Sequence, residues 1–157
     1  MLFSDNSSLD VVSWLYSFDD GSVFSSLQHP TYIYQNAGVF SPSLNVISDK
    51  GCENIFTLDV QVNEIPNPDF LIENSCEGDP NVFTDVSTIS NGTIDFYNFV
   101  FGDGTPDGSN MTEYHQYNQS GTFNVLLTVT SNKGCQNTIQ KLTEVFPLPE
   151  VDFTSSQ

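Results

Sequence analysis

The sequence contains no arginine and three lysines, against 20 aspartate and glutamate residues, so its formal net charge is −17 over 157 residues. A surface this acidic repels the phosphate backbones of nucleic acids and the headgroups of anionic membranes. The composition therefore argues against nucleic-acid binding. It favours interaction with cations, and the charge also keeps the protein soluble through self-repulsion.

Long apolar runs are also absent. No stretch of about 18 apolar residues occurs, and no charged segment leads into an apolar one at the start. The sequence therefore predicts no membrane insertion, and a secretion signal would have to lie outside these residues. Aromatic residues make up 13% of the chain, and apolar residues alternate with polar ones, which argues against disorder.

No residue pattern predicts catalysis. His115 is the only candidate base, but no nucleophile lies at a suggestive spacing from it. The carboxylates of Asp19 and Asp20, or of Asp103 and Asp107, could be considered as a glycosidase pair, yet carboxylates in one turn leave no cleft between an acid and a nucleophile. The segment Gly102–Gly104 lacks the G-K-[ST] that a phosphate loop requires. We therefore predict a protein that is not an enzyme and requires no cofactor.

An internal repeat relates the two halves of the chain at a constant offset of 83 residues. A fixed period of this length predicts structural units in series. The period predicts an incomplete repeat over residues 1–65, which lacks its first strand, and a complete one over 66–149, with 150–157 as the first strand of a third. Matching pairs include Phe18 with Phe101, Asp20 with Asp103, Tyr34 with Tyr117, Cys52 with Cys135, Pro66 with Pro149 and Phe70 with Phe153.

The complete repeat shows short stretches in which apolar and polar residues alternate, bounded by glycine, asparagine, aspartate or proline. This pattern predicts an all-β fold of tandem antiparallel immunoglobulin-like β-sandwiches. Tyr97, Phe99 and Phe101 share one face of a strand, and we expect that face to be core. The predicted strands cover residues 69–73, 81–87, 93–101, 113–117, 121–131 and 137–145.

The three cysteines form an odd count that the period explains. Cys52 and Cys135 occupy matching positions, whereas the counterparts of Cys76 fall outside the sequence. We therefore expect one disulfide per repeat, here between Cys76 and Cys135, which would stabilise the fold by about 4 kcal/mol in the chain-entropy model and indicate an extracellular protein. The alternative is buried free thiols. The lack of a C-x-x-C spacing argues against zinc.

One loop has the spacing of calcium ligands. Asp103, Thr105, Asp107 and Gly108 occupy positions 1, 3, 5 and 6 of a D-x-[DNST]-x-D-G pattern, and Glu113 occupies position 11. Hard oxygen ligands at such a spacing can wrap Ca²⁺. A polar turn without metal is the alternative, because the bidentate glutamate belongs at position 12 and repeat one lacks the pattern.

The motif Phe101-Gly102-Asp103-Gly104 is followed by His115-x-Tyr117 and by the alternating run from Gly121 to Val129. These residues resemble the PKD domain, and the Lys133-Gly134-Cys135 turn resembles disulfide-bearing PKD repeats of large surface and secreted proteins of gliding and biofilm-forming bacteria. Repeat one departs from the pattern with Asp19 and Tyr32 in place of Gly102 and His115. Those departures favour a fold signature over an obligatory chemical role.

The resemblance implies a non-enzymatic structural or adhesive segment of a large extracellular surface adhesin or filament. The alternative is an accessory spacer or substrate-docking module of a secreted protease or polysaccharide-degrading enzyme. Expected partners are neighbouring repeats and a surface polysaccharide or protein ligand. Copies of the chain could also pair head to tail, because residues 151–154 repeat the strand that repeat one lacks.

Overall fold

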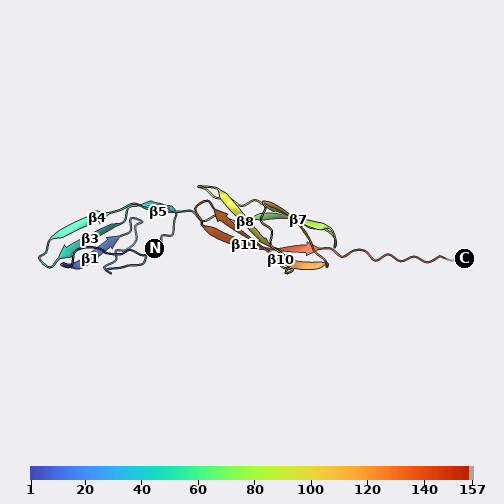
Figure 1. Cartoon of the computed structure of the whole chain (residues 1–157), viewed down its shortest axis with the longest axis horizontal. Coiled ribbons are helices and arrows are strands. Elements are labelled where there is room, and N and C mark those ends of the chain that lie inside the picture. The colour runs from blue at the N-terminus through green and yellow to red at the C-terminus, as the bar shows by residue number, and fades with distance from the viewer. Residues whose placement is uncertain (156–157) are drawn as a thin grey trace. The chain divides into compact units, whose positions relative to one another are not determined.

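A computed structural model describes residues 1–155 of the chain. The chain divides into two compact units, Met1–Glu64 and Ile65–Gln157, here called unit 1 and unit 2. The described residues form antiparallel β-sheets without any helix, as Figure 1 shows for each unit. No segment in this part of the chain is a helix able to cross a membrane.

Unit 2 is a sandwich of two three-stranded sheets. One sheet has the order β6–β7–β9 and the other β8–β10–β11, and all pairs in both are antiparallel. The strands are β6 (Phe70–Glu73), β7 (Pro80–Asp85), β8 (Ile94–Val100), β9 (Thr112–Gln116), β10 (Gly121–Ser131) and β11 (Gln136–Val145). Each of the six predicted strands is present, with ends that agree within two residues.

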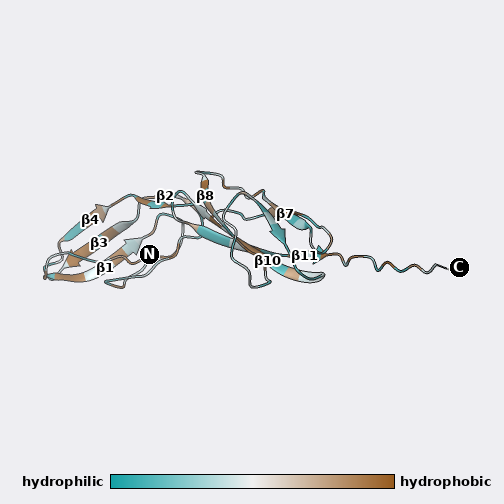
Figure 2. Ribbon diagram, turned by 45° about the vertical axis from the view of Figure 1, so that its right-hand side comes forward, coloured by the Kyte–Doolittle hydropathy of each residue, from teal (hydrophilic) through white to brown (hydrophobic). Residues whose placement is uncertain are grey.

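The core of unit 2 lies between the two sheets. Phe99 of β8 contacts Phe70 of β6 in an edge-to-face arrangement, with ring centroids 5.5 Å apart. Along β10, which Figure 2 labels, every second residue from Val125 to Val129 is fully buried, so one face of the strand lies in the core. The buried core consists of Phe70, Phe83, Phe99, Phe101, Tyr117, Val125, Leu127, Val129 and Val145.

Unit 1 repeats this plan with shorter strands. It has one sheet of order β1–β3–β4 and a two-stranded sheet β2–β5. The bounds are β1 (Val11–Ser17), β2 (Gly38–Phe40), β3 (Ser43–Ser48), β4 (Glu53–Thr57) and β5 (Val60–Val62). At the offset of 83 residues, β2 and β3 together match β10, and β4 and β5 match β11. Pro42 replaces Val125 at the break, and a proline cannot donate to the strand ladder.

The core of unit 1 is smaller and contains Phe3, Tyr16, Phe18 and Val60. Phe3 contacts Tyr16 and Phe18 at 6.1 and 5.3 Å, as Phe83 contacts Phe99 and Phe101 in unit 2 at 6.2 and 5.5 Å. Phe3 therefore takes the place of Phe83, although the offset of 83 aligns it with Val86.

Candidate functional site

The sequence motif of unit 2 forms one hydrogen-bonded cluster at the end of β8. The Asp103 carboxylate accepts hydrogen bonds from the Thr105 amide at 3.1 Å and the Thr105 hydroxyl at 2.6 Å, and His115 Nε2 lies 2.8 Å from it. The His115 ring stacks on Phe101 at 3.9 Å, and the Tyr117 hydroxyl donates to the Phe101 carbonyl at 2.9 Å. The cluster thus ties β9 and the chain after it to the turn after β8.

Unit 1 builds the ring-stacking and carboxylate contacts from different residues, but the hydroxyl of Tyr34, the counterpart of Tyr117, has no hydrogen-bond partner among residues 1–155. The Tyr32 ring stacks on Phe18 at 3.8 Å, and its hydroxyl donates to the Asp20 carboxylate at 2.6 Å. A tyrosine thus supplies both the ring and the polar atom that His115 supplies in unit 2. Because a phenol replaces the imidazole and keeps the ring stacking and the carboxylate hydrogen bond, these two contacts do not require a histidine.

The ionisation of Asp103 makes the stability of unit 2 depend on pH. Burial opposes its charged form, but hydrogen bonds from Thr105 and His115 outweigh that effect, so the pKa of Asp103 lies below its usual value. A carboxyl with a lowered folded-state pKa stabilises the fold above its unfolded pKa of about 4 and loses that contribution as the pH falls. We expect the unfolding free energy of unit 2 to decline below about pH 4, and Asp103→Asn to make this decline shallower.

Urea unfolding at several pH values, followed by hydrogen exchange of unit 2 amides, measures this slope. Asp95→Asn, an exposed position on β8, is the control and should keep the slope of the unsubstituted chain. Equal slopes for Asp103→Asn and the unsubstituted chain would contradict a contribution from the Asp103 carboxylate.

The four residues of the predicted calcium loop each have other partners. Asp103 bonds Thr105 and His115, Asp107 accepts from the Asn98 side-chain amide at 3.2 Å, and Glu113 accepts from the backbone and side chain of Asn110. Among residues 1–155 no group of three or more His, Cys, Asp or Glu side chains is placed to hold a metal. The calcium site stays a prediction.

Calcium binding is tested by thermal unfolding in millimolar CaCl₂ and in chelator. If the loop binds Ca²⁺, Asp107→Asn should remove a rise in melting temperature that the unsubstituted chain shows, because it removes one anionic ligand and leaves the Asp103 cluster intact. An unchanged melting temperature in the unsubstituted chain would leave the loop as a polar turn.

The cysteines depart from the predicted pairing, since Cys52, Cys76 and Cys135 are all free. Cys76 pairs with Phe146 just beyond the end of β11, whereas Cys135 lies before the start of β11. The ten residues of β11 separate the two positions, or about 30 Å at the rise of an extended strand. A disulfide requires Cα atoms within about 7 Å. The structure therefore corrects the predicted Cys76–Cys135 bridge, because the two thiols lie at opposite ends of unit 2.

This arrangement predicts the thiol content of the monomer. Titration of the denatured, unreduced monomer fraction should give three thiols per chain, since no two cysteines of one unit can meet. One thiol per chain would restore the bridge that the sequence suggested and would require a different path for β11.

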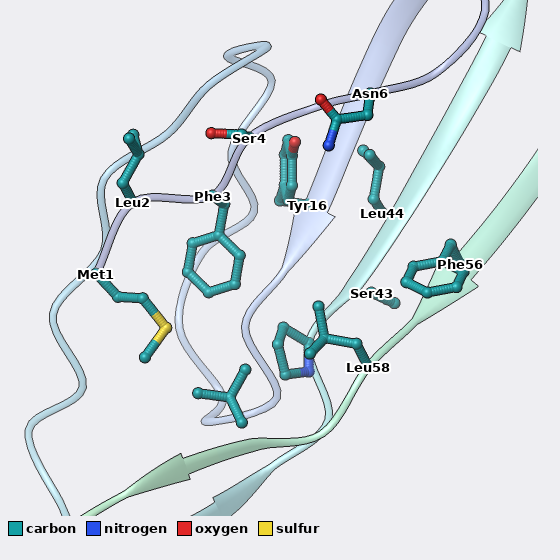
Figure 3. Close-up of a pocket in the computed structure, with 12 residues that line it drawn as sticks. Met1, Leu2, Phe3, Ser4, Asn6, Tyr16, Ser43, Leu44, Phe56 and Leu58 are labelled. Atoms are coloured by element: carbon teal, nitrogen blue, oxygen red, sulfur yellow. The ribbon is translucent and has the colours of Figure 1, made fainter.

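Unit 1, the repeat predicted to lack its first strand, carries an apolar groove of about 360 Å³. Figure 3 shows Phe3, Tyr16, Leu44, Phe56 and Leu58 around this groove. Phe56 is 68% exposed and Leu58 47%, so the walls of the groove are open to solvent. At the offset of 83 residues Tyr16, Leu44, Phe56 and Leu58 match Phe99, Leu127, Ile139 and Lys141, whereas Phe3 takes the place of Phe83 outside this register.

Comparison with known families gives a match in both halves of the chain. The PKD domain family matches residues 1–62 and again residues 63–146. These two segments correspond closely to the structural units, and together they cover most of the chain.

Solved structures similar to this chain include other PKD domains. The PKD1 domain of Vibrio anguillarum Epp is 29% identical, with a TM-score of 0.50, over 55% of this chain and 100% of that one. The PKD1 domain from the Vibrio cholerae metalloprotease PrtV is 29% identical, with a TM-score of 0.48, over 53% of this chain and 99% of that one. A third structure is described as the structural basis for the promiscuous specificity of carbohydrate-binding modules from the β-sandwich superfamily. It is 30% identical, with a TM-score of 0.52, over 55% of this chain and 36% of that one.

Proposed function

Because this chain belongs to the PKD domain family and matches it in two consecutive segments, we propose that it is a non-enzymatic structural or adhesive segment of a large extracellular surface adhesin or filament. The observation that carries the proposal is the serial arrangement of two units, each with its own aromatic core. The matching contacts of the Asp103 and Asp20 clusters support it, since in each unit they connect an aromatic ring and a carboxylate of neighbouring segments.

Other features agree with this function. The formal charge of −17 favours an extended, soluble array through self-repulsion between neighbouring units. Pro66 and Pro68 lie at the start of the proposed repeat 66–149, directly after residues 1–65, and two prolines limit the flexibility of the chain at this boundary. Family membership supports an extracellular location, whereas the free cysteines give that location no support.

Pulling single molecules of the full chain by both ends tests the structural role. A load-bearing segment should show two separate unfolding events, and released chain should lengthen by about 3.5 Å per residue of each unit. Phe99→Ala, which lies in the core of unit 2, should weaken one event and leave the other unchanged. Extension without any resisting event would contradict a structural function.

A docking module of a secreted enzyme is the second candidate. The similarity to a structure described for carbohydrate-binding modules favours it, together with exposed aromatic rings on which sugars could stack. Phe96 and Tyr114 of unit 2 are 68% and 70% exposed. Co-sedimentation with insoluble polysaccharides separates the candidates, because saturable binding that Phe96→Ala or Tyr114→Ala removes would favour docking over a purely structural role.

A further inference from the structure

The segment that leads into unit 2 runs beside β11 in the same direction. Side chains of β11 donate hydrogen bonds to this segment at three places. The pairs are Asn137 with the Pro66 carbonyl at 3.0 Å, Lys141 with the Phe70 carbonyl at 2.6 Å and Thr143 with the Asn74 side-chain oxygen at 2.9 Å. The partners are separated by 71, 71 and 69 residues along the chain. Because this separation is nearly constant, residues 66–74 lie parallel to β11.

At its far end the same contact becomes a backbone pairing. Cys76 pairs with Phe146 in the parallel direction. The Glu77 amide donates to the Phe146 carbonyl at 2.8 Å, and the Phe146 amide donates to the Ser75 carbonyl at 3.0 Å. Residues 66–77 and 137–146 therefore form one continuous line of contacts, here called the seam.

Lys141 makes the contacts at the middle of the seam. Paired strands lie about 4.8 Å apart and the sheets of a sandwich about 10 Å apart, so β6 and β11, which belong to different sheets, need long side chains to meet. Besides its bond to the Phe70 carbonyl, Lys141 Nζ lies 2.5 Å from the Asp69 carboxylate and 5.1 Å from the Phe70 ring centroid. One ammonium thus holds two consecutive residues at the start of β6 through charge-assisted hydrogen bonds and a cation–π contact.

The seam lies between the points where the chain enters and leaves unit 2. In an array of units, a pull on the chain acts backwards on residues 65–66 and forwards on the residues after Val145. Because the two segments are parallel, these pulls slide them past one another along the seam. All contacts of the seam are then loaded together, whereas segments that are pulled apart at one end lose their contacts one by one.

We propose that the seam is the mechanical clamp of unit 2 and that Lys141 is the residue that holds β6 in register with β11 under load. The inference rests on the structural function proposed above and names the contacts that carry the load. Resistance to force depends on the rate of unfolding, and contacts that break before the transition state set that rate. Loss of a seam contact therefore speeds unfolding under force.

The direction of pulling tests the clamp in the full chain. With the native cysteines replaced by serine, one pair of handles at Ile65→Cys and Leu148→Cys loads the seam lengthwise, and both positions are at least 60% exposed. A second pair at Ile65→Cys and Lys133→Cys, in the exposed turn before β11, pulls the two segments apart at one end. The lengthwise unfolding force should be about two to three times the other, because three groups of side-chain hydrogen bonds share the load.

Substitution of Lys141 tests its place in the clamp. Lys141→Met keeps an apolar chain of similar length and removes the ammonium. In the lengthwise geometry it should raise the unfolding rate at a fixed force by about two- to tenfold, the range of one hydrogen bond. Lys133→Met removes the same charge from the exposed turn and should leave the rate unchanged.

Two further variants separate the seam from general stability. Asn74→Ala removes the acceptor of Thr143 and should raise the lengthwise unfolding rate as Lys141→Met does. Thr128→Ala removes the hydrogen bond between the hydroxyls of Thr128 and Thr138, which join β10 and β11 outside the seam at 2.8 Å. It should leave the lengthwise rate close to that of the unsubstituted chain.

Two results overturn the proposal. One is an equal unfolding force in the two directions, which needs no substitution within the seam and so does not depend on whether a seam variant folds. The other is an unfolding rate that Lys141→Met changes no more than Lys133→Met or Thr128→Ala does. In both cases unit 2 still resists force, so the proposed structural function stands. The absence of any resisting event in either direction contradicts that function itself.

Discussion

Replacing Phe99 with alanine should destabilise unit 2 by about 3–5 kcal/mol. Phe99 is fully buried, and its ring contacts Phe70, Phe83 and Phe101 at centroid distances of 5.5, 6.2 and 6.4 Å. Its removal leaves a cavity between two sheets that cannot close without breaking strand pairing. Domains have a free energy of unfolding of about 5–15 kcal/mol, so the substitution removes a large part of the stability of a small unit.

The neighbouring exposed position gives the control. Phe96 lies on the same strand and is 68% exposed, so Phe96→Ala should change stability by less than about 0.5 kcal/mol. Hydrogen exchange resolves the units, and the single tryptophan, Trp14, reports on unit 1 by fluorescence. Similar losses for both variants, or an altered Trp14 transition in Phe99→Ala, would contradict a separate core centred on Phe99.

The strands of unit 2 could be predicted because their signals are local. Alternation of apolar and polar residues defines β10, whose predicted and observed ends agree at Gly121 and Ser131. The core face predicted from Tyr97, Phe99 and Phe101 is also confirmed, since Phe99 and Phe101 are buried and Tyr97 packs against the core cluster. Each of these features depends on the pleat of one strand, which the sequence displays directly.

The differences between the units could not be predicted from the repeat alone. Phe3 fills the place of Phe83 by a shift of three positions, which depends on pairing between Leu2 and Thr31. Such a register is set by contacts between distant segments, and the offset of 83 residues hides it. The break between β2 and β3 did have a local signal in Pro42, because a proline interrupts a strand ladder.

The candidate sites also depend on contacts between distant residues, which the sequence does not display. The spacing of Asp103, Asp107 and Glu113 fits a calcium loop, but spacing does not reveal that each carboxylate faces a different partner. The period pairs Cys76 with Cys135 as members of one repeat without showing that they lie at opposite ends of β11. Buried Asn81, which donates to Thr143 at 2.9 Å, joins the two sheets and carries no motif at all.

Gly102→Ala is expected to produce the second large loss, on the order of 3 kcal/mol in unit 2, because two costs combine there. Gly102 has a φ of +82°, and a Cβ at this position would lie 2.3 Å from the Asn124 carbonyl oxygen of β10. The backbone of a paired strand cannot move away without losing its ladder bonds, so strain and collision both act.

Gly104→Ala separates the two costs. Gly104 has a similar φ of +80° but nothing within 4 Å of the added Cβ, so its substitution should cost only about 1–2 kcal/mol of backbone strain. Unit 1 explains why the fold tolerates another residue at the Gly102 position. Asp19 has a φ of 62° there, and its carboxylate accepts the Ser41 amide at 2.8 Å. Ser41, the counterpart of Asn124, lies in the break between β2 and β3.

Chemical denaturation of the two glycine variants, followed by hydrogen exchange of unit 2 amides, measures how much unfolding free energy each variant loses. Because both positions share the left-handed backbone, a larger loss for Gly102→Ala reports the collision with β10. Equal losses would mean that the backbone of β10 moves away from the added Cβ at Asn124, where unit 1 has the break between β2 and β3 at Ser41. The interruption of the long strand in unit 1 would then be a deformation that either repeat can adopt.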